Sequence, residues 1–354
     1  MTEKIKYAII GAGCMGQEHI LNIGIIDDAE VVALCDTSEQ SIKESLELLN
    51  NEVAIFNDYN DLIESNIANA FIIATPNFTH INVLKDVMKS GVHLLIEKPL
   101  CTTVKDCQEF EKLAENYPGV IWTAMEYRYM PPVQRMIKEI HNNTIGDLKM
   151  LSIREHRFPF LHKVDDWNRF AIKTGGTLVE KCCHFFDLMT QVIPSKPTRV
   201  IASGGQDVNH LNESYGGETP DILDNAYVIV EFANGARALL DLCMFAEGSR
   251  HEQHIAVTGD IGKIETTVPG DELIISNRAS NDFQTIKIEP DSRVKEQGLH
   301  HGASYLEHLG FIEAINNGAP PAVTVRDGLL SVVMGAAAQQ SIESGQAVNL
   351  NDLL

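Results

Sequence analysis

The sequence predicts two domains, an N-terminal α/β domain with a doubly wound parallel sheet and a C-terminal α+β domain with a large, mostly antiparallel sheet. In the first third of the 354 residues, short apolar runs alternate with helical segments, which is typical of a parallel sheet covered by helices. From about residue 147, Asn-Gly and other glycine-containing turns join the apolar runs, which indicates antiparallel hairpins. The predicted domains are residues 1–124 and 125–354, and the last helices belong to the second domain or pack back on the first.

The composition is that of a globular protein with an acidic surface. Asp and Glu number 49 against 28 Lys and Arg, so the formal net charge is -21. Such a surface repels phosphate backbones and anionic membranes, so we expect neither nucleic-acid nor membrane binding. No stretch approaches ~18 uncharged apolar residues, and the start has no signal-peptide layout. The seven cysteines include no CxxC pair, so we expect reduced thiols and a cytoplasmic protein.

The first element is a strand over 5–10, which runs into the glycine turn GAGCMG and a helix over 17–26. A second strand over 30–35 ends at Asp36. The order of strand, GxGxxG, helix, strand and acid is typical of a Rossmann dinucleotide-binding domain.

Each glycine of this turn has a predicted role. Gly11 permits the tight turn, Gly13 lets the backbone approach a pyrophosphate, and Gly16 lets helix and strand pack closely. Cys14 and Met15 lie between them, where the helix N-terminus faces the phosphates.

Asp36 is expected to accept hydrogen bonds from the adenosine ribose hydroxyls. Thr37 and Ser38 follow it, with no Arg or Lys to meet a 2′-phosphate. The sequence therefore favours NAD over NADP, with Asp36 and Thr37 among the cofactor contacts.

The alternation continues to residue 125. Helices are predicted over 38–49, 80–91 and 103–116, and strands over 69–76, 92–97 and 120–125. Ligands of doubly wound sheets bind at the carboxyl ends of the strands. Two sequences stand at such ends, ATPN (74–77) and EKP (97–99).

The second domain is predicted from a series of strand-like runs. They lie at 147–158, 198–204, 226–245, 253–268, 271–277 and 283–289, with helices over 177–193, 303–317 and 326–345. An antiparallel sheet often leaves one face free, which here could pair with another subunit. The polar, glycine-rich loop 204–225 is either functional or mobile, and its acids lack EF-hand spacing.

Ionisable residues run through the apolar segment GGTLVEKCCHFFDLMTQ (175–191). Glu180, His184 and Asp187 are spaced i, i+4, i+7, so one continuous helix would place them on one face. Its other positions are apolar nearly all round, which predicts burial. Buried carboxylates and histidines are costly unless paired or used.

Together these motifs resemble the glucose–fructose oxidoreductase / inositol dehydrogenase / MocA family. The resemblance rests on GAGCMG, Asp36, ATPNFTH (74–80), EKPL (97–100) and GGTLVEKCCHFFDL, and it extends over nearly the whole chain. It implies NAD(P) in the first domain and oxidation or reduction of a sugar or cyclitol at a carbinol carbon.

The family's catalytic Lys matches Lys98, its Asp matches Glu180 and its His matches His184. Hydride transfer from an alcohol needs a base for the hydroxyl proton, and an imidazole can serve near neutral pH. We predict that His184 is this base, that Glu180 orients it or binds the sugar, and that Lys98 stabilises alkoxide charge. The longer Glu180 and the unusual Lys181, Cys182 and Cys183 depart from the family pattern and suggest a particular subfamily.

Softer candidates complete the predicted site. The resemblance places Thr75, Pro76, Asn77 and Glu97 near the nicotinamide and Met125 near the substrate. His80 begins the next helix, and it either contacts the cofactor or only caps that helix. The Lys98–Pro99 peptide bond could be cis. Arg157, Asp166, Trp167 and Asn168 lie between a strand and the catalytic segment. Trp167 either stacks on a sugar or belongs to the core.

Other interpretations remain open. A Glu–His pair four residues apart is often only a helix-stabilising contact, and Glu180, Cys183 and His184 could ligate a metal, although the dehydrogenase needs none. The leading hypothesis is an NAD-dependent sugar, polyol or inositol dehydrogenase that forms a homodimer or homotetramer. The alternatives are an NAD-dependent glycoside hydrolase using transient oxidation and elimination, and a non-catalytic NAD-binding regulator.

Overall fold

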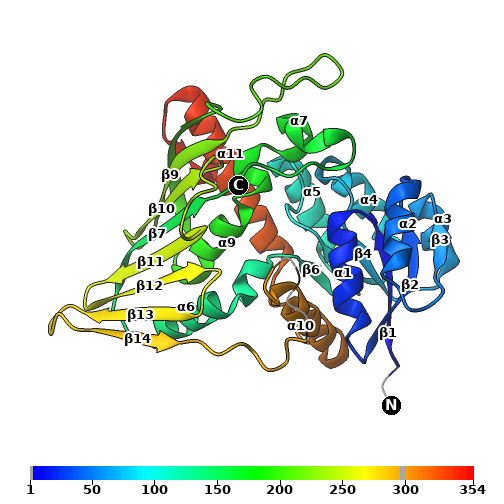
Figure 1. Ribbon diagram of the computed structural model, residues 1–354, viewed down its shortest axis with the longest axis horizontal. Coiled ribbons are helices and arrows are strands. Elements are labelled where there is room, and N and C mark those ends of the chain that lie inside the picture. Colours follow the sequence, from blue (N-terminus) through cyan, green and yellow to red (C-terminus); the bar gives the residue numbers. More distant parts are fainter. Residues whose placement is uncertain (1–2, 296–297, 299) are drawn as a thin grey trace. The chain divides into compact units, whose positions relative to one another are not determined.

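The computed structural model describes residues 3–295, 298 and 300–354. The chain folds into two compact units (Figure 1). The first unit comprises residues 1–126 and 292–329, and the second comprises residues 127–291 and 330–354. The first unit is therefore built from two separate stretches of the chain.

The first unit contains the predicted parallel sheet. Its six strands are β1 (Ile5–Ile10), β2 (Ala29–Cys35), β3 (Ala54–Phe56), β4 (Ala70–Ile73), β5 (His93–Ile96) and β6 (Ile121–Thr123). They are ordered β3-β2-β1-β4-β5-β6, and every neighbouring pair is parallel. Nearly every side chain of the central strands is buried, because helices cover both faces. The doubly wound prediction is confirmed.

The helices of the first unit follow the strands in alternation. They are α1 (Cys14–Gly24), α2 (Glu39–Glu47), α3 (Tyr59–Ser65), α4 (His80–Val87), α5 (Val104–Ala114) and α10 (Ala303–Asn317), with the short 3-10 turn η1 (Asn77–Thr79). Ser38 and Thr103 cap the starts of α2 and α5 through their side chains. Strand β3 and helix α3 were not predicted from the sequence. Strand β3 is a three-residue, partly exposed edge strand without a clear period.

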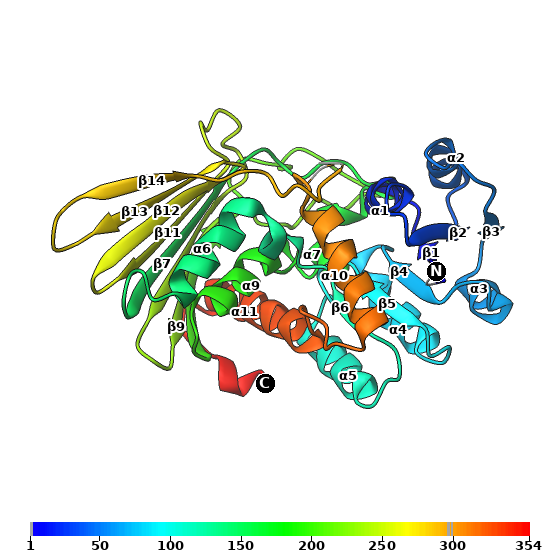
Figure 2. The same ribbon diagram turned by 90° about the horizontal axis from the view of Figure 1, so that it is seen from below.

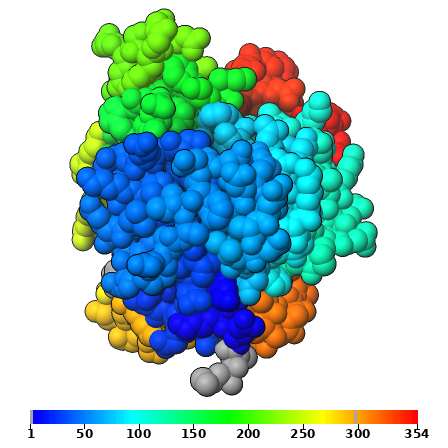
Figure 3. All heavy atoms as spheres, turned by 90° about the vertical axis from the view of Figure 1, so that its right-hand side faces the viewer, coloured from blue at the N-terminus to red at the C-terminus, as the bar shows by residue number. Residues whose placement is uncertain are grey.

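Helix α10 comes from the end of the chain but packs against α1. Figure 2 shows it beside the parallel sheet, and in Figure 3 its residues (orange) reach the surface next to the N-terminal strand (dark blue). The interaction is partly polar, since Trp122 Nε1 donates to Glu307 Oε1 at 3.1 Å. The tilted rings of Tyr7 and Phe311 lie 6.2 Å apart. Residues 303–317 thus complete the core of the first unit.

The second unit contains a nine-stranded sheet. Its strands are β7 (Leu148–His156), β8 (Pro197–Gly205), β9 (Asn225–Phe232), β10 (Arg237–Cys243), β11 (Gln253–Gly259), β12 (Gly262–Val268), β13 (Glu272–Asn277), β14 (Phe283–Lys287) and β15 (Val348–Asn349). The order is β14-β13-β12-β11-β7-β10-β9-β8-β15. Only the β7–β10 pair of these strands is parallel, so the mostly antiparallel prediction is confirmed.

Helices of the second unit lie on one face of this sheet, as Figures 1 and 2 show for α6 and α9. The elements are α6 (Pro131–His141), α7 (Ala171–Thr174), α8 (Thr177–Glu180), α9 (Cys183–Val192) and the greater part of α11 (Val325–Ser344), with 3-10 turns η2 (Glu126–Tyr129), η3 (Val164–Arg169) and η4 (Leu350–Asp352). Helix α6 was not predicted from the sequence, although Pro131 and Pro132 stand at its first positions.

The predicted single helix over 177–193 is wrong. Helix α8 ends at Glu180 and α9 begins at Cys183, with a turn at Lys181 and Cys182 between them. Both turn residues keep right-handed helical dihedral angles. Glu180 therefore precedes this turn and His184 follows it. The predicted burial is confirmed, because every residue from Thr177 to Met189 is buried.

The outer face of the sheet carries exposed apolar side chains. Tyr227 is 62% exposed and Met150 is 61% exposed. Ile201, Ile229 and Leu239 are register partners across β8, β9 and β10, so they form a continuous apolar row.

Among the helices of the described residues, none combines the length and the apolar character that a membrane span requires.

Candidate active site

The glycine turn between β1 and α1 has the geometry of a dinucleotide-binding turn. Gly11 has φ +100°, and an added Cβ would lie 2.5 Å from the Ala74 backbone. A Cβ on Gly16 would lie 2.1 Å from the carbonyl oxygen of Gly11, whereas one on Gly13 would meet no heavy atom within 4 Å. Local packing therefore requires glycine at positions 11 and 16 but not at position 13. No side chain of the described residues caps the start of α1.

Asp36 binds the glycine turn directly. Its Oδ2 accepts a hydrogen bond from Ala12 N at 2.7 Å, and its Oδ1 accepts one from Ser38 N at 2.8 Å. Each carboxylate oxygen has a second lone pair, so these bonds leave acceptor capacity for a ligand hydroxyl. The carboxylate also joins the glycine turn to the start of α2, a role that sequence analysis did not predict.

His80 joins the two candidate sequences at the carboxyl ends of β4 and β5. Its Nε2 lies 3.0 Å from the carbonyl oxygen of Thr75, and its Nδ1 lies 3.0 Å from that of Pro99. The ring is fully buried, and this burial lowers its pKa although the surrounding carbonyl oxygens act in the opposite direction. His80 thus ties the turn after β4 to the segment after β5, rather than capping a helix. Asn77 is buried in the same turn.

Glu97 ends a buried chain of three ionisable side chains. Its Oε1 lies 3.0 Å from His19 Nε2, and His19 Nδ1 lies 2.9 Å from His308 Nε2. Burial raises the pKa of Glu97, but the hydrogen bond and charge of His19 and the charge of Lys98 outweigh it, so the pKa lies well below its ordinary value. Burial holds the pKa of His308 well below its ordinary value. Glu97 is therefore a carboxylate, and His308 is neutral.

Lys98 follows this carboxylate directly. Its backbone N–H donates to Glu97 Oε2 at 3.1 Å, and the Lys98–Pro99 peptide bond is cis. Lys98 is partly exposed. Met125, which follows the end of β6 by two residues, is fully buried in the first unit.

The second unit holds the predicted acid–base pair in a buried segment. Glu180 and His184 are 4% and 3% exposed. The ring of His184 stacks on the ring of Tyr127, with centroids 4.5 Å apart and an interplanar angle of 21°. Tyr127 also contacts Phe185 edge-on. His184 is thus held against a hydroxyl-bearing aromatic ring, a partner that sequence analysis did not identify.

Asp187 has a structural partner. Arg128 binds it in a bidentate pair, with Nε donating to Oδ2 at 2.6 Å and Nη2 donating to Oδ1. The Arg128 and Asp187 side chains are 10% and 1% exposed. This pair joins η2 to α9 and accounts for the charge of Asp187.

The other predicted substrate residues lie near β7 and in η3. Arg157 Nη1 lies 3.5 Å from the carboxylates of Glu155 and Glu252. Trp167 is buried, with Lys163 Nζ 5.6 Å from its ring centroid. Asn168 is also buried and donates from Nδ2 to the carbonyl oxygen of Leu161 at 2.9 Å.

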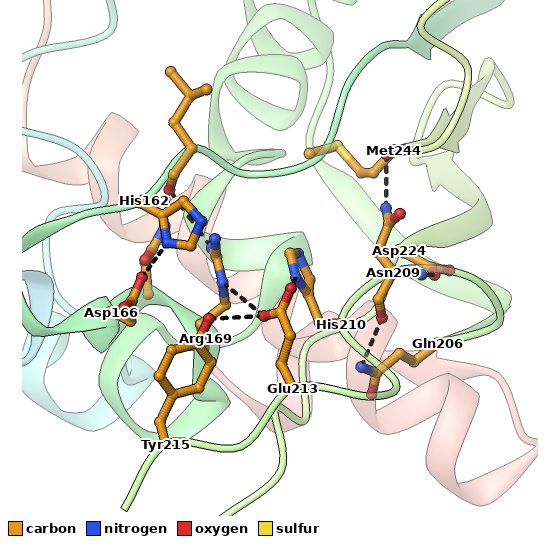
Figure 4. Close-up of polar contacts among 12 residues, drawn as sticks. His162, Asp166, Arg169, Gln206, Asn209, His210, Glu213, Tyr215, Asp224 and Met244 are labelled. Carbon is orange, nitrogen blue, oxygen red and sulfur yellow. Dashed lines mark hydrogen bonds and ion pairs between the residues drawn. The ribbon is translucent and has the colours of Figure 1, made fainter.

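The long loop before β9 is held by specific contacts, as Figure 4 shows. Asp224 accepts hydrogen bonds from the backbone N–H groups of residues 207–209 at 2.7 to 3.1 Å. Burial raises the pKa of Asp224, but these bonds outweigh burial and lower it overall. The buried Arg169 lies 3.5 Å from Glu213, which accepts from Tyr215 and binds His210. His162 and Asp166 form a neighbouring pair at 2.5 Å. These contacts tie the loop to the segment that holds Trp167 and Asn168.

Within the described residues, no group of three or more His, Cys, Asp or Glu side chains is arranged to hold a metal ion. Cys182 and Cys183 are both buried in the core of the second unit.

Comparison with protein families assigns both parts of the chain. Residues 5–125 match the model of an oxidoreductase family, NAD-binding Rossmann fold, and residues 137–350 match that of an oxidoreductase family, C-terminal alpha/beta domain. The chain belongs to the Gfo/Idh/MocA oxidoreductase family. As in this family, its first domain is an NAD(P)-binding Rossmann domain, so the family predicted from the motifs is confirmed.

Relatives in the Gfo/Idh/MocA family match over the full length. The chain is 26% identical to the myo-inositol 2-dehydrogenase of Thermotoga maritima, covering 99% of this chain and 100% of that protein. It is 23% identical to the scyllo-inositol 2-dehydrogenase (NAD(+)) of Bacillus subtilis, covering 99% and 98%. The fold is also similar to that of levoglucosan dehydrogenase in complex with NADH and levoglucosan, with a TM-score of 0.86 and 20% identity over 98% of this chain and 100% of that one.

Several polar residues around the family motifs were missed from the sequence. His19 and His308 are 289 residues apart in the chain, so no local spacing reveals their contact. Tyr127 and Arg128 lie in a 3-10 turn without periodicity. Lys181 was noted only as a departure from the family pattern, although a lysine in an apolar segment already signals a buried partner.

Proposed function

We propose that the chain is an NAD-dependent dehydrogenase that transfers a hydride between a carbinol carbon of a sugar, sugar derivative or inositol-like cyclitol and the nicotinamide. The observation that carries this proposal is the buried His184 imidazole, stacked on Tyr127 in the domain that follows the NAD(P)-binding domain. The relatives named as dehydrogenases of inositols and of levoglucosan support the substrate class.

The residues of the first unit fit the dinucleotide. The open space at Gly13 and the helix start without a side-chain cap suit a pyrophosphate. The remaining acceptor capacity of Asp36 suits ribose hydroxyls. The proposed cofactor contacts are Gly11, Gly13, Cys14, Met15, Gly16, Asp36, Thr37, Thr75, Pro76, Asn77, His80, Glu97 and Lys98.

Three residues of the chain form the proposed acid–base set. His184 accepts the hydroxyl proton of the substrate, Glu180 orients the imidazole or binds a sugar hydroxyl, and Lys98 stabilises the developing alkoxide. When bound, NAD supplies the hydride acceptor. Met125, Arg157, Trp167 and Asn168 are the further proposed substrate residues.

The test is the absorbance of reduced nicotinamide when the purified protein is mixed with NAD and a panel of inositols, aldoses, sugar acids and glycosides. We expect the band to grow with at least one free polyol or sugar. Cleavage of a glycoside without net growth of the band would instead favour the transient-oxidation hydrolase. Tight NAD binding without turnover on the whole panel would favour the regulator.

We further propose that NAD is preferred over NADP because of the Asp36 carboxylate, which repels a 2′-phosphate. Replacing Asp36 with serine is expected to raise the ratio of kcat/KM with NADP to that with NAD at least about tenfold, as expected for removing about 1.4 kcal/mol of charge repulsion. The same change removes a carboxylate that accepts two N–H bonds, so the melting temperature should fall.

Asp58→Ser is the matched control for Asp36. Asp58 also accepts a backbone N–H bond at a helix start, from Asn60 at 2.8 Å, but it lies outside the glycine turn. If the ratio of kcat/KM with NADP to that with NAD were unchanged in Asp36→Ser, Asp36 would not determine the cofactor preference.

We also propose that the chain forms a homodimer or homotetramer through the outer face of the nine-stranded sheet. The support is the apolar row of Ile201, Ile229 and Leu239 beside the exposed Tyr227, since exposed apolar patches mark association sites. Ile229→Glu should lower the particle mass measured by light scattering to that of a monomer. Ile172→Glu, at a side chain 83% exposed on α7, should leave the mass unchanged, and an unchanged mass for Ile229→Glu would refute this interface.

A further inference from the structure

Lys181 lies in the turn between α8 and α9 and is buried beneath them. Its Nζ lies 3.0 Å from Glu155 Oε1 on β7, and it donates to the hydroxyl oxygen of Tyr127 at 3.3 Å. The whole residue is 8% exposed, and Glu155 is 0% exposed. An ammonium group thus lies inside the second unit, between the inner face of the sheet and the ring that stacks on His184.

This lysine remains charged. Burial lowers its pKa, but the Glu155 carboxylate and Tyr127 outweigh burial, so the pKa lies above its ordinary value. Arg157 Nη1 lies 3.5 Å from the same carboxylate oxygen, so Glu155 is shared between two cations. Lys181 therefore keeps its positive charge at every pH at which the imidazole titrates.

Tyr127 connects this charge to His184. Its hydroxyl oxygen accepts one hydrogen bond from Lys181 and a second from Gln253 Nε2 at 2.7 Å. These two bonds fix the plane of a ring that lies nearly parallel to the imidazole. The position of the imidazole thus depends on a network that begins at Glu155.

An ordinary buried ion pair does not account for this arrangement. Apolar residues of similar size often replace such a pair without loss of stability. Arg128 and Asp187 also join η2 to α9, so the helix segment has a second polar attachment besides Lys181. What Lys181 adds is a permanent positive charge beside the Tyr127–His184 stack.

We propose that Lys181 is a positioning residue of the acid–base site, which fixes the Tyr127 ring against His184 and keeps the imidazole neutral and ready to accept a proton. This inference rests on the proposed function, in which His184 is the base. A nearby positive charge disfavours a second one, so the ammonium opposes premature protonation of His184.

The segments that carry Tyr127, Lys181 and His184 also hold other ionisable groups. The linked ionisable groups are Glu180 and Asp187 on the segment of His184, Tyr127 and Arg128 on η2, Glu155 on β7, and Arg157 after β7. Arg128 neutralises Asp187, and Glu155 is shared by Lys181 and Arg157. Lys181 contacts the ring that stacks on His184, with its Nζ 5.5 Å from the centroid of the Tyr127 ring.

The experiment titrates the His184 ring by NMR in the full chain labelled at histidine, without substrate, using His184→Gln to assign the signal. In Lys181→Met the ring should titrate about one pH unit higher than in the unmodified chain. Lys181→Arg keeps the charge and should restore the titration. Ile153→Val, a smaller core change on the same inner face of β7, should leave it unchanged.

If Lys181→Met does not fold, the double variant Lys181→Gln, Glu155→Gln replaces both charges with amides that can bond to each other. It should shift the His184 titration in the same direction by a smaller amount, because it removes the Glu155 carboxylate together with the Lys181 ammonium, and the two charges act on the imidazole in opposite directions. An unshifted His184 titration in the folded variants would overturn the inference.

Kinetics separates this inference from the proposed function. With a substrate found in the panel, the acidic limb of the pH profile of kcat/KM should move with the NMR titration. The kcat/KM of Lys181→Met should therefore fall about tenfold on the acidic side and by less on the alkaline side. A uniform loss at all pH values would overturn the role of the charge. A clear NMR shift in a chain that oxidises no polyol would reject the dehydrogenase and leave the link between Lys181 and His184 intact.

Discussion

His184→Ala is expected to lower kcat/KM by roughly 10²–10⁴-fold, the usual effect of removing a catalytic base. The residue lies in the second unit, whereas the glycine turn and Asp36 lie in the first. The dissociation constant for NAD should therefore stay within about twofold, measured by calorimetry on the same preparation.

His254→Gln is the matched control, because it replaces another histidine of the second unit that lies on β11 with a partly exposed side chain. It should keep both turnover and NAD binding. If His184→Ala instead lost NAD binding, the imidazole would belong to the cofactor site, and the proposed base would have to be sought elsewhere.

Gly16→Ala should reduce the stability of the fold, whereas Gly13→Ala should reduce the affinity for NAD. At Gly16 the new Cβ would lie 2.1 Å from a backbone oxygen, and overpacking of this kind typically costs about 1–3 kcal/mol. Gly16→Ala should lower the melting temperature of the protein without NAD. At Gly13, φ is −77° and no atom lies within 4 Å, so Gly13→Ala should keep that melting temperature and weaken NAD binding at least about tenfold, or 1.4 kcal/mol.

Gly24→Ala supplies the control for both glycines, since Gly24 ends α1 and an added Cβ there meets nothing within 4 Å. It should leave NAD binding unchanged and stabilise the helix by at most about 0.5 kcal/mol, because Gly24 is the last residue of α1. Equal NAD binding in Gly13→Ala and Gly24→Ala would show that the backbone at Gly13 does not approach the cofactor.

Much of the fold follows from local patterns. The buried runs of β1 and β4 and the glycine turn between β1 and α1 are dictated by residues close in sequence. The break after Glu180 could not be predicted in the same way, because both turn residues keep helical angles and only the hydrogen bonding of the turn separates α8 from α9. Helix α6 could have been predicted from the sequence, since its two adjacent prolines mark a helix start.

The candidate site was also predictable only where local motifs mark it. The positions of Lys98, Glu180 and His184 were found through motifs, which are local. The partners that set their environment are distant in sequence: His19 for Glu97, Tyr127 for His184 and Glu155 for Lys181. Contacts between single polar residues leave no period in a sequence, so only the folded chain identifies them.

The discontinuity of the first unit has a consequence for synthesis on the ribosome. Strand β1 and helix α1 are made first, yet Tyr7, His19 and Trp122 lie against Phe311, His308 and Glu307 of α10. These partners are translated only after the whole nine-stranded sheet except β15. Domains generally fold as units during translation, but here the N-terminal domain exposes apolar and polar core groups until more than 300 residues have been made. Nascent chains that stall before α10 would therefore need chaperone protection, and a truncated dinucleotide-binding domain would not substitute for the whole protein.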